Sequence, residues 1–304
     1  MLKSNLKSFE LKNYLKEKRA VIDERLAFYI QKYTSPGRLS DAIKYAVMTG
    51  GKRLRPILCI AAGETVQGVS NDLLIATGCA VEFIHAYSLV HDDLPAMDDD
   101  SMRRGKPTCH AAFDEATAVL AGDALLTLAF EVLSTEIPRW IDDPAECLKI
   151  IGIVSKAAGA RGMVEGQMRD MLAEGREISL EALESLHCLK TGALITASVE
   201  SGALLSGADN RQSSYLKEYA HALGMAFQVT DDLLNVEGDP EVMGKAVGTD
   251  AKKMKSTYPA LMGVAASREK ARHLIDNALR ALDFFDTKAD PLRAIAAYVL
   301  EREK

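Results

Sequence analysis

The commonest pattern along the chain is helical, with apolar and small residues recurring every three to four positions. The segments with this spacing are 41–48, 56–66, 73–91, 117–133, 180–205 and 215–236. The alternation typical of a half-buried strand is almost absent. Glycine and proline residues that stop helices separate the segments at 36–37, 50–51, 138, 144, 175, 207 and 238–240. The pattern predicts an all-α fold, a bundle of roughly ten or more helices.

Composition is consistent with one such bundle. The chain has 304 residues, a length that by itself allows about two domains. No linker rich in serine, glycine or proline divides it, so we expect a single helical domain over residues 1–304. Apolar residues make up 48% of the chain, which is enough to fill a sizeable core.

Charge and cysteine content narrow the function classes. The net charge of −6 argues against nucleic acid as a partner, because binding to phosphate backbones needs a basic face. The five cysteines are scattered without a CxxC pair, so they predict neither disulfides nor a zinc site. The start of the chain lacks the continuous apolar stretch of a signal peptide, and no run of eighteen apolar residues occurs. We therefore expect a cytoplasmic protein that is not inserted in a membrane.

Two helices with apolar residues on nearly every side both end in paired aspartates. One ends at Asp92 and Asp93, and the other ends at Asp231 and Asp232. A helix C-terminus already carries partial negative charge, and neighbouring carboxylates raise each other's pKa, so these ends require cations. An isolated pair of this kind is more typical of a turn. Two pairs together favour a site where Mg²⁺ links carboxylates to the oxygens of a diphosphate.

The first aspartate motif, HDDLPAMDDDSMRRGKPT at 91–108, raises a question of geometry. Asp92 and Asp98 stand six residues apart, so they would face different directions on a regular helix. Pro95 cannot donate a hydrogen bond to the carbonyl of His91, so we expect the helix to end there. This break allows Asp98 to fold back toward Asp92.

Three clusters of basic residues supply the expected cations. They are Lys52, Arg53 and Arg55 in GGKRLRP, Arg103 and Arg104 after the first aspartate motif, and Lys190 with Lys245 and Lys255. The first cluster precedes a proline suited to the first turn of a helix, a position that binds anions. Its spacing does not match a Walker loop. Each cluster alone is more typical of a solvated surface.

In combination, these motifs resemble those of the trans-isoprenyl diphosphate synthases. The family's order is kept over residues 40–304 by GGKRLRP, EFIHAYSLVHDDLPAMDDDSMRRGKPT, GMVEGQMRDM, KTGAL, FQVTDDLLNVEGD, GKAVGTD and KSTYPAL. The chain is most similar to the short-chain bacterial enzymes that make farnesyl diphosphate. The resemblance implies helices around a central cavity, a homodimer, and Mg²⁺-dependent condensation of isopentenyl diphosphate with dimethylallyl and geranyl diphosphate.

The resemblance also implies roles for individual residues. Three Mg²⁺ ions on an allylic diphosphate would be held by Asp92, Asp98 and Asp231, supported by Asp93 and Asp232. The same diphosphate would contact Arg103, Lys190, Lys245 and Lys255. Isopentenyl diphosphate would bind without metal at Lys52, Arg55, His85 and Arg104. The positions beside the reacting carbons match Thr191 and Gln228.

Product length in the resembling family depends on the helix that leads to the first aspartate motif. Tyr87 and Ser88 lie five and four residues before Asp92, roughly one turn or about 5.4 Å deeper than the diphosphate. In the family a large residue here stops growth after three isoprene units, so Tyr87 predicts farnesyl diphosphate as the main product. The alternative is a geranylgeranyl diphosphate synthase.

One position departs from the family pattern and keeps other functions open. Many members have an aspartate at Asn235, and an amide is a weaker Mg²⁺ ligand, so we leave Asn235 out of the metal set. The sequence DDLLNVEGD also resembles a terpene cyclase motif, but a cyclase has no need of a second diphosphate pocket. A subunit that only tunes another synthase is a further alternative, against which both aspartate motifs argue. A structural acidic helical protein would bind no diphosphate with Mg²⁺.

Overall fold

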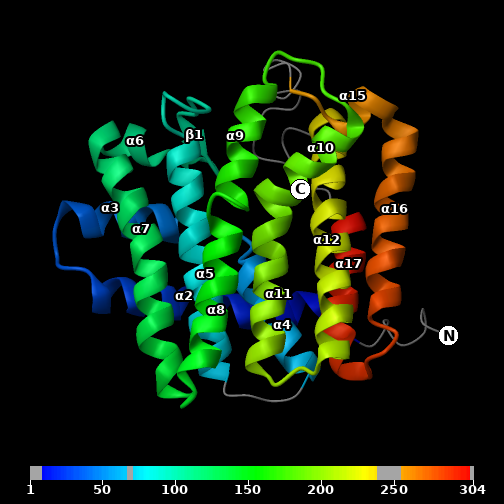
Figure 1. Ribbon diagram of the computed structural model, residues 1–304. Helices are drawn as coiled ribbons and strands as arrows, with labels where there is room; N and C mark the ends of the chain where they lie inside the picture. The colour runs from blue at the N-terminus through cyan, green and yellow to red at the C-terminus, as the bar shows by residue number, and fades with distance from the viewer. Residues whose placement is uncertain (1–8, 67–70, 238–254, 302–304) are drawn as a thin grey trace.

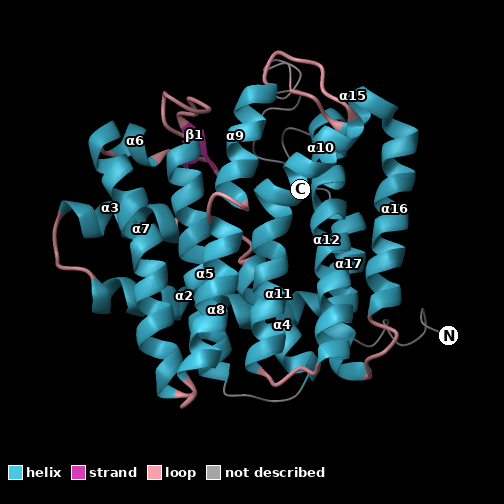
Figure 2. Cartoon of the chain, viewed as in Figure 1, coloured by secondary structure: helices cyan, strands magenta, loops and turns pink. Residues whose placement is uncertain are grey.

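The protein is almost entirely helical, which confirms the predicted all-α fold (Figures 1 and 2). The computed structural model describes residues 9–66, 71–237 and 255–301. Helices α7, α5, α8, α11, α12 and α16 stand side by side in the ribbon view, and α2 crosses behind them (Figure 1). The predicted ligand Lys245 and the predicted stop at 238–240 lie outside the described residues.

The helices account for most of the described residues. Their bounds are α2 (Leu11–Tyr33), α3 (Arg38–Met48), α4 (Leu54–Val66), α5 (Asn71–Asp92), α6 (Cys109–Ala112), α7 (Glu115–Glu136), α8 (Pro144–Ala158), α9 (Met163–Ala173), α10 (Leu180–His187), α11 (Ala193–Leu205), α12 (Asn210–Glu237), α15 (Tyr258–Met262), α16 (Val264–Ala281) and α17 (Asp290–Glu301). Short 3₁₀ turns at Ile137–Arg139 (η2) and Thr287–Ala289 (η4) adjoin α7 and α17.

Helices α5 and α7 are apolar enough to cross a membrane by length and composition alone. In α5, 83% of the most apolar window is buried, so its apolar character is explained by its place in the core. In Glu115–Arg139, which is α7 with its 3₁₀ extension, only 44% of that window is buried. The exposed face of α7 includes Val119 (40% exposed) and Leu120 (58% exposed). This face therefore carries apolar surface that the described part of the chain leaves uncovered.

The segment 180–205, predicted from its periodicity as helical throughout, contains a π-helical turn. This turn, η3 (Cys188–Gly192), lies between α10 and α11 and carries Lys190 and Thr191. A π turn inserts an extra residue into a helix, and such turns are frequent at functional sites. Simple three-to-four spacing does not reveal this local change.

A two-stranded hairpin follows the first aspartate motif. Met102–Arg103 (β1) pairs with Lys106–Pro107 (β2) in antiparallel fashion. Arg104 and Gly105 between them have φ angles of 52° and 74°, the left-handed values that a tight hairpin turn of this length requires. The turn directs Arg103 and Arg104 to different partners, Asp93 for Arg103 and the carbonyl of Gly50 for Arg104.

Candidate functional site

The first aspartate motif folds back on itself as the sequence predicted. Helix α5 ends at Asp92, and the backbone N–H of Asp98 donates a hydrogen bond to the carbonyl of Asp92 at 2.8 Å. Pro95 lies inside this reversal. The predicted break is thus confirmed, and it brings Asp92 and Asp98 to the same end of α5.

A cavity of about 330 Å³ opens beside this end, between α5 and α9. The predicted site residues that line it are Arg55, His85, Tyr87, Ser88, Asp92, Lys190 and Thr191. Apolar side chains from α9 and from the aspartate motif complete the wall, namely Met97, Met163, Val164, Met168 and Met171. The cavity therefore has a charged end at Asp92 and Lys190 and apolar side chains, with Tyr87 among its lining residues, over the rest of its wall.

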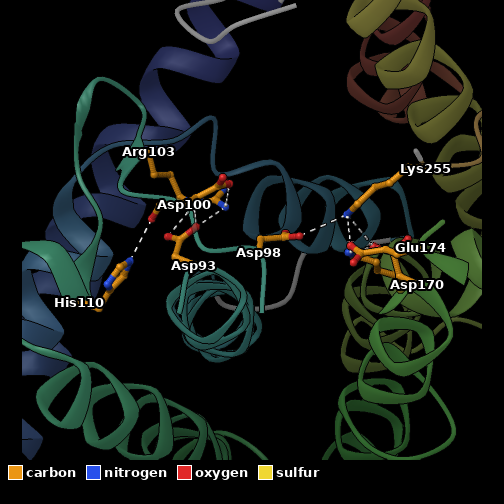
Figure 3. A network of polar contacts seen from close by, with 9 residues as sticks. Asp93, Asp98, Asp100, Arg103, His110, Asp170, Glu174 and Lys255 are labelled. Carbon is orange, nitrogen blue, oxygen red and sulfur yellow. Dashed lines mark hydrogen bonds and ion pairs between the residues drawn. The ribbon is translucent and has the colours of Figure 1, made fainter. Parts of the chain in front are cut away.

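The carboxylates at the charged end are in an environment that favours a cation. Burial raises the pKa of Asp92 to about 6; Lys190 opposes this rise and the neighbouring Asp98 adds to it. Lys255 Nζ lies 3.3 Å from Asp98 Oδ1 and, on its other side, 3.3 Å from Asp170 Oδ2, as Figure 3 shows. The ammonium group of Lys255 thus bridges the aspartate motif and α9.

Within residues 9–66, 71–237 and 255–301, no three Asp, Glu, His or Cys side chains could hold a metal ion by themselves. The donor set nevertheless suits Mg²⁺, because this ion is usually bound by one or two carboxylates with phosphate oxygens and water completing its shell. The raised pKa of Asp92 also indicates a carboxyl group whose charge is incompletely compensated. The residues present therefore fit Mg²⁺ that arrives together with a diphosphate.

Asp170 on α9 is a site residue that the sequence did not single out. Its Oδ2 accepts a hydrogen bond from Lys190 Nζ at 2.6 Å. Burial alone would raise the pKa of Asp170, but the positive charge of Lys190, followed by that of Lys255, holds this pKa below its usual value. Gly166, one turn earlier, allows this approach, since a Cβ there would lie 2.2 Å from the backbone nitrogen of Lys190. The spacing of Gly166 and Asp170 in GMVEGQMRDM was the available signal.

Arg103 forms an ion pair with the carboxylate of Asp93. Its Nε lies 2.8 and 2.9 Å from the two carboxylate oxygens of Asp93, which is 3% exposed. Figure 3 shows this pair beside Asp98 and Asp100. Asp93 therefore positions Arg103 at the edge of the site, in agreement with a supporting role for Asp93.

Asp232, the second member of the second aspartate pair, has a structural role. Asp232 is buried and its Oδ2 accepts the backbone N–H of Tyr258 at 2.9 Å, which ties the start of α15 to α12. This contact anchors the segment that carries Lys255, three residues before Tyr258.

Gln228, earlier on α12, is held by a histidine. Its Nε2 donates a hydrogen bond to His187 Nδ1 at 3.1 Å. Burial lowers the pKa of His187 to about 4, so this ring accepts the hydrogen bond in its neutral form.

The cations predicted for the second diphosphate are only partly together. Arg55 and His85 line the same cavity, and the pKa of His85 is lowered well below its usual value by burial and then by Arg55 and Arg104. The Arg104 guanidinium donates to the carbonyl of Gly50. Lys52 instead lines a separate cavity of about 470 Å³ between α2, α12 and α17, where its Nζ lies 5.9 Å from the ring centre of Tyr298.

Comparison with known proteins identifies the family of the chain. The family model described as polyprenyl synthetase matches residues 36–294. The chain is similar to a farnesyl diphosphate synthase of Escherichia coli strain K12, with 49% identity over 87% of this chain and 89% of the relative. It is also similar to a geranylgeranyl diphosphate synthase of Cyanophora paradoxa, with 42% identity over 97% of both chains.

A solved structure shares the fold. The structure of an FPP/GFPP synthase from Zymomonas mobilis, in its apo form, matches with a TM-score of 0.84 and 39% identity. The match covers 95% of this chain and 98% of that one. The helices that build the cavity therefore belong to an architecture that is shared over nearly the whole chain.

Proposed function

The chain belongs to the polyprenyl synthetase family, and from this premise we propose that it condenses isopentenyl diphosphate with dimethylallyl and then geranyl diphosphate. The products are farnesyl diphosphate and inorganic diphosphate. Close bacterial relatives such as the one from E. coli carry the name farnesyl diphosphate synthase, which supports this product. Tyr87, which lines the cavity, also supports it, because its bulk would restrict the path of a longer chain.

The observation that carries the two-substrate function is a cationic pocket that contains a buried donor without a hydrogen bond. Arg55 Nε is buried and makes no hydrogen bond within the described part of the chain. Burial lowers the pKa of Arg55, nearby Glu82 opposes this change, and Arg104 lowers the pKa further. A buried donor without a hydrogen bond is costly, and Glu82 is already paired with Arg53, so the pocket favours an anionic ligand such as a diphosphate. This cationic part belongs to the same cavity as Asp92 and gives the site a second place for a diphosphate, which a terpene cyclase has no need of.

Bond making and breaking in this reaction need no nucleophilic side chain. The allylic carbon–oxygen bond breaks, and its electron pair leaves with diphosphate. The double bond of isopentenyl diphosphate supplies the electrons of the new carbon–carbon bond, and a proton then passes to a diphosphate oxygen. Lys190 and Lys255, held in place by Asp170, would bind the leaving diphosphate. Cations that are preorganised in this way need no rearrangement as charge develops.

Thr191 and Gln228 would act on the other reacting group, the positively charged allylic carbon. Thr191 lines the cavity next to Lys190. Gln228 is held by its hydrogen bond to His187, so its amide dipole has a defined orientation. Hydroxyl and amide oxygens placed near the carbon would stabilise the cation, and neutral His187 adds no competing positive charge.

Mg²⁺ belongs to this proposal as the cofactor, with three ions per allylic diphosphate. Asp92, Asp98 and Asp231 would hold it. When bound, Mg²⁺ supplies positive charge that stabilises the leaving diphosphate. Asn235 is buried on α12, one turn after Asp231, and stays outside the proposed ligand set.

We further propose that the protein is a cytoplasmic homodimer. The uncovered apolar face of α7, with Val119 and Leu120, supports a contact between two copies. All five cysteines are free, which is consistent with a reducing compartment. Light scattering of the purified chain tests the dimer, and a Leu120→Glu variant that becomes monomeric would identify α7 as the interface.

The experiment that tests the function uses the purified chain alone. Geranyl and isopentenyl diphosphates are supplied with Mg²⁺ or with excess EDTA, and products are identified by mass spectrometry. We expect farnesyl diphosphate only with Mg²⁺. A cyclic hydrocarbon formed without consumption of isopentenyl diphosphate would instead show a terpene cyclase, and a lack of any turnover by the chain alone would favour a tuning subunit.

A further inference from the structure

His91 precedes the first metal-ligand candidate, yet the chemistry described above makes no use of it. Its imidazole lies against α7, where Nε2 donates a hydrogen bond to the carbonyl of Val119 at 3.1 Å. Asp123 Oδ1 lies 4.0 Å from the same nitrogen. The side chain is 28% exposed, so most of the ring is enclosed between α5 and α7.

The surface of α7 is shaped to accept this ring. Gly122 lies under the imidazole, and a Cβ at this position would stand 2.0 Å from His91 Nε2. No ring atom can remain at such a distance from a carbon, so only glycine admits His91 in its present position. The hydrogen bond to Val119 and the slot at Gly122 together fix the imidazole against α7.

The fixed imidazole supports Tyr87. The two rings are one helical turn apart on α5, with centroids 5.7 Å apart and planes at 81°, an edge-to-face contact of the kind aromatic rings prefer. Tyr87 is 7% exposed, and both residues line the cavity that begins at Asp92. On this side, therefore, His91 occupies the space into which the Tyr87 ring would otherwise turn.

We propose that His91 is a positioning residue for product length, which holds the Tyr87 ring across the cavity and sets where chain growth stops. The inference rests on the proposed condensation and adds a determinant to it. A side chain with two rotatable bonds restricts a cavity only when neighbours hold its rotamer. His91 provides that restraint through Gly122 and Val119, both of which belong to another helix.

The first test is the His91→Ala variant, supplied with geranyl and isopentenyl diphosphates and Mg²⁺. Removing the ring gives Tyr87 room to turn toward α7, so the ratio of geranylgeranyl to farnesyl product should rise about tenfold, the scale on which relief of an overpacked site acts. The Michaelis constant for isopentenyl diphosphate should stay unchanged, because Arg55 and His85 are not disturbed. His273→Ala, an exposed histidine on α16, is the matched control and should leave the ratio unchanged.

The second test reaches the same ring from α7. Gly122→Ala forces the imidazole out of its slot and should lengthen the product as His91→Ala does. Gly152→Ala on α8 makes the same exchange where a Cβ would meet nothing within 4 Å, and it should leave the product as farnesyl diphosphate. If Gly122→Ala does not fold, as judged by circular dichroism, His91→Ala still decides the question.

The third test asks whether His91 acts through Tyr87. In a Tyr87→Ala background, adding His91→Ala should not lengthen the product further, because the group that His91 positions is already gone. An unchanged product ratio in folded, active His91→Ala enzyme would overturn the inference, and so would effects of the two substitutions that simply multiply. Failure of the proposed function has a different signature, namely no condensation by the unmodified chain.

Discussion

Asp170 and Lys190 form an ion pair across the cavity wall, with 2.6 Å between the carboxylate oxygen and the ammonium nitrogen. The pair joins α9 to the π-helical turn η3, and Lys255 extends it to Asp98. Two lysines expected to bind diphosphate are therefore already placed by a carboxylate before any ligand arrives. The site thus depends on an acidic residue that is not among its predicted metal ligands.

Replacement of Asp170 by asparagine should impair catalysis while leaving the fold intact. Hydrogen bonds between charged groups contribute about 1.5–3 kcal/mol, so kcat/KM for geranyl diphosphate should fall about 10- to 100-fold. Steady-state kinetics measure this change. Glu165→Gln, which removes a carboxylate from the exposed side of the same helix, is the control and should have little effect. Equal activities of the two variants would mean that Lys190 and Lys255 need no such support.

Asp92→Asn should abolish Mg²⁺-dependent turnover, and the ligand-free variant should also be more stable at neutral and higher pH. The pKa of Asp92 is about 6 in the folded protein, against about 3.9 for an unfolded aspartate. Because the folded state binds the proton more tightly, ionisation of Asp92 reduces stability as the pH rises through this interval. Asparagine cannot ionise and avoids the loss. After discounting for partial exposure, we expect the free energy of unfolding of Asp92→Asn to exceed that of the unmodified protein by about 1–2 kcal/mol at about pH 8.

Urea unfolding in EDTA as a function of pH measures this gain. The difference between Asp92→Asn and the unmodified protein should vanish below about pH 4, where both side chains are neutral. Asp142→Asn changes an exposed carboxylate just before α8 and is the control at each pH. A variant that is less stable than the parent at pH 8, or that retains near-normal kcat, would contradict the role assigned to Asp92.

The two neighbouring arginines should affect different substrates. Arg104→Ala should chiefly raise the Michaelis constant for isopentenyl diphosphate, because Arg104 stands beside the pocket of Arg55 and His85. Arg103→Ala should chiefly impair the allylic substrate, since Arg103 is held at the aspartate motif by Asp93. Losing one charge-assisted contact predicts changes of about 10- to 100-fold. Equal effects of both variants on one Michaelis constant would show that this division is wrong.

Tyr87 and Ser88 should control product length in opposite directions. Tyr87→Ala removes the bulk from the apolar end of the cavity, so the main product should shift from farnesyl to geranylgeranyl diphosphate or longer. Ser88→Phe fills the cavity earlier and should shorten the product, since overfilling a packed site costs about 1–3 kcal/mol. Mass spectrometry of the products measures both changes. If a folded, active Tyr87→Ala enzyme still makes farnesyl diphosphate, the end of the cavity lies elsewhere.

Several parts of this protein follow from the sequence alone. Helical periodicity depends on residues a few positions apart, so it predicted the all-α fold and the courses of α4, α5 and α7 closely. The effect of Pro95 is equally local, and the reversal that brings Asp98 to Asp92 was predicted from it. The order of the acidic and basic motifs was sufficient to indicate the family.

Other parts were decided only when the helices packed. Whether charges meet depends on how closely two helices approach, and Gly166 permits the contact that places Asp170 on Lys190 although twenty residues separate them. Lys52 and Arg55 stand three residues apart in the sequence, yet they line different cavities because the start of α4 directs them to different sides. The position of the His91 ring likewise depends on packing between helices, because Gly122 on α7 leaves the space that the ring fills. Local pattern determines which helices form and what they carry, whereas the distances between side chains on different helices are set by tertiary packing.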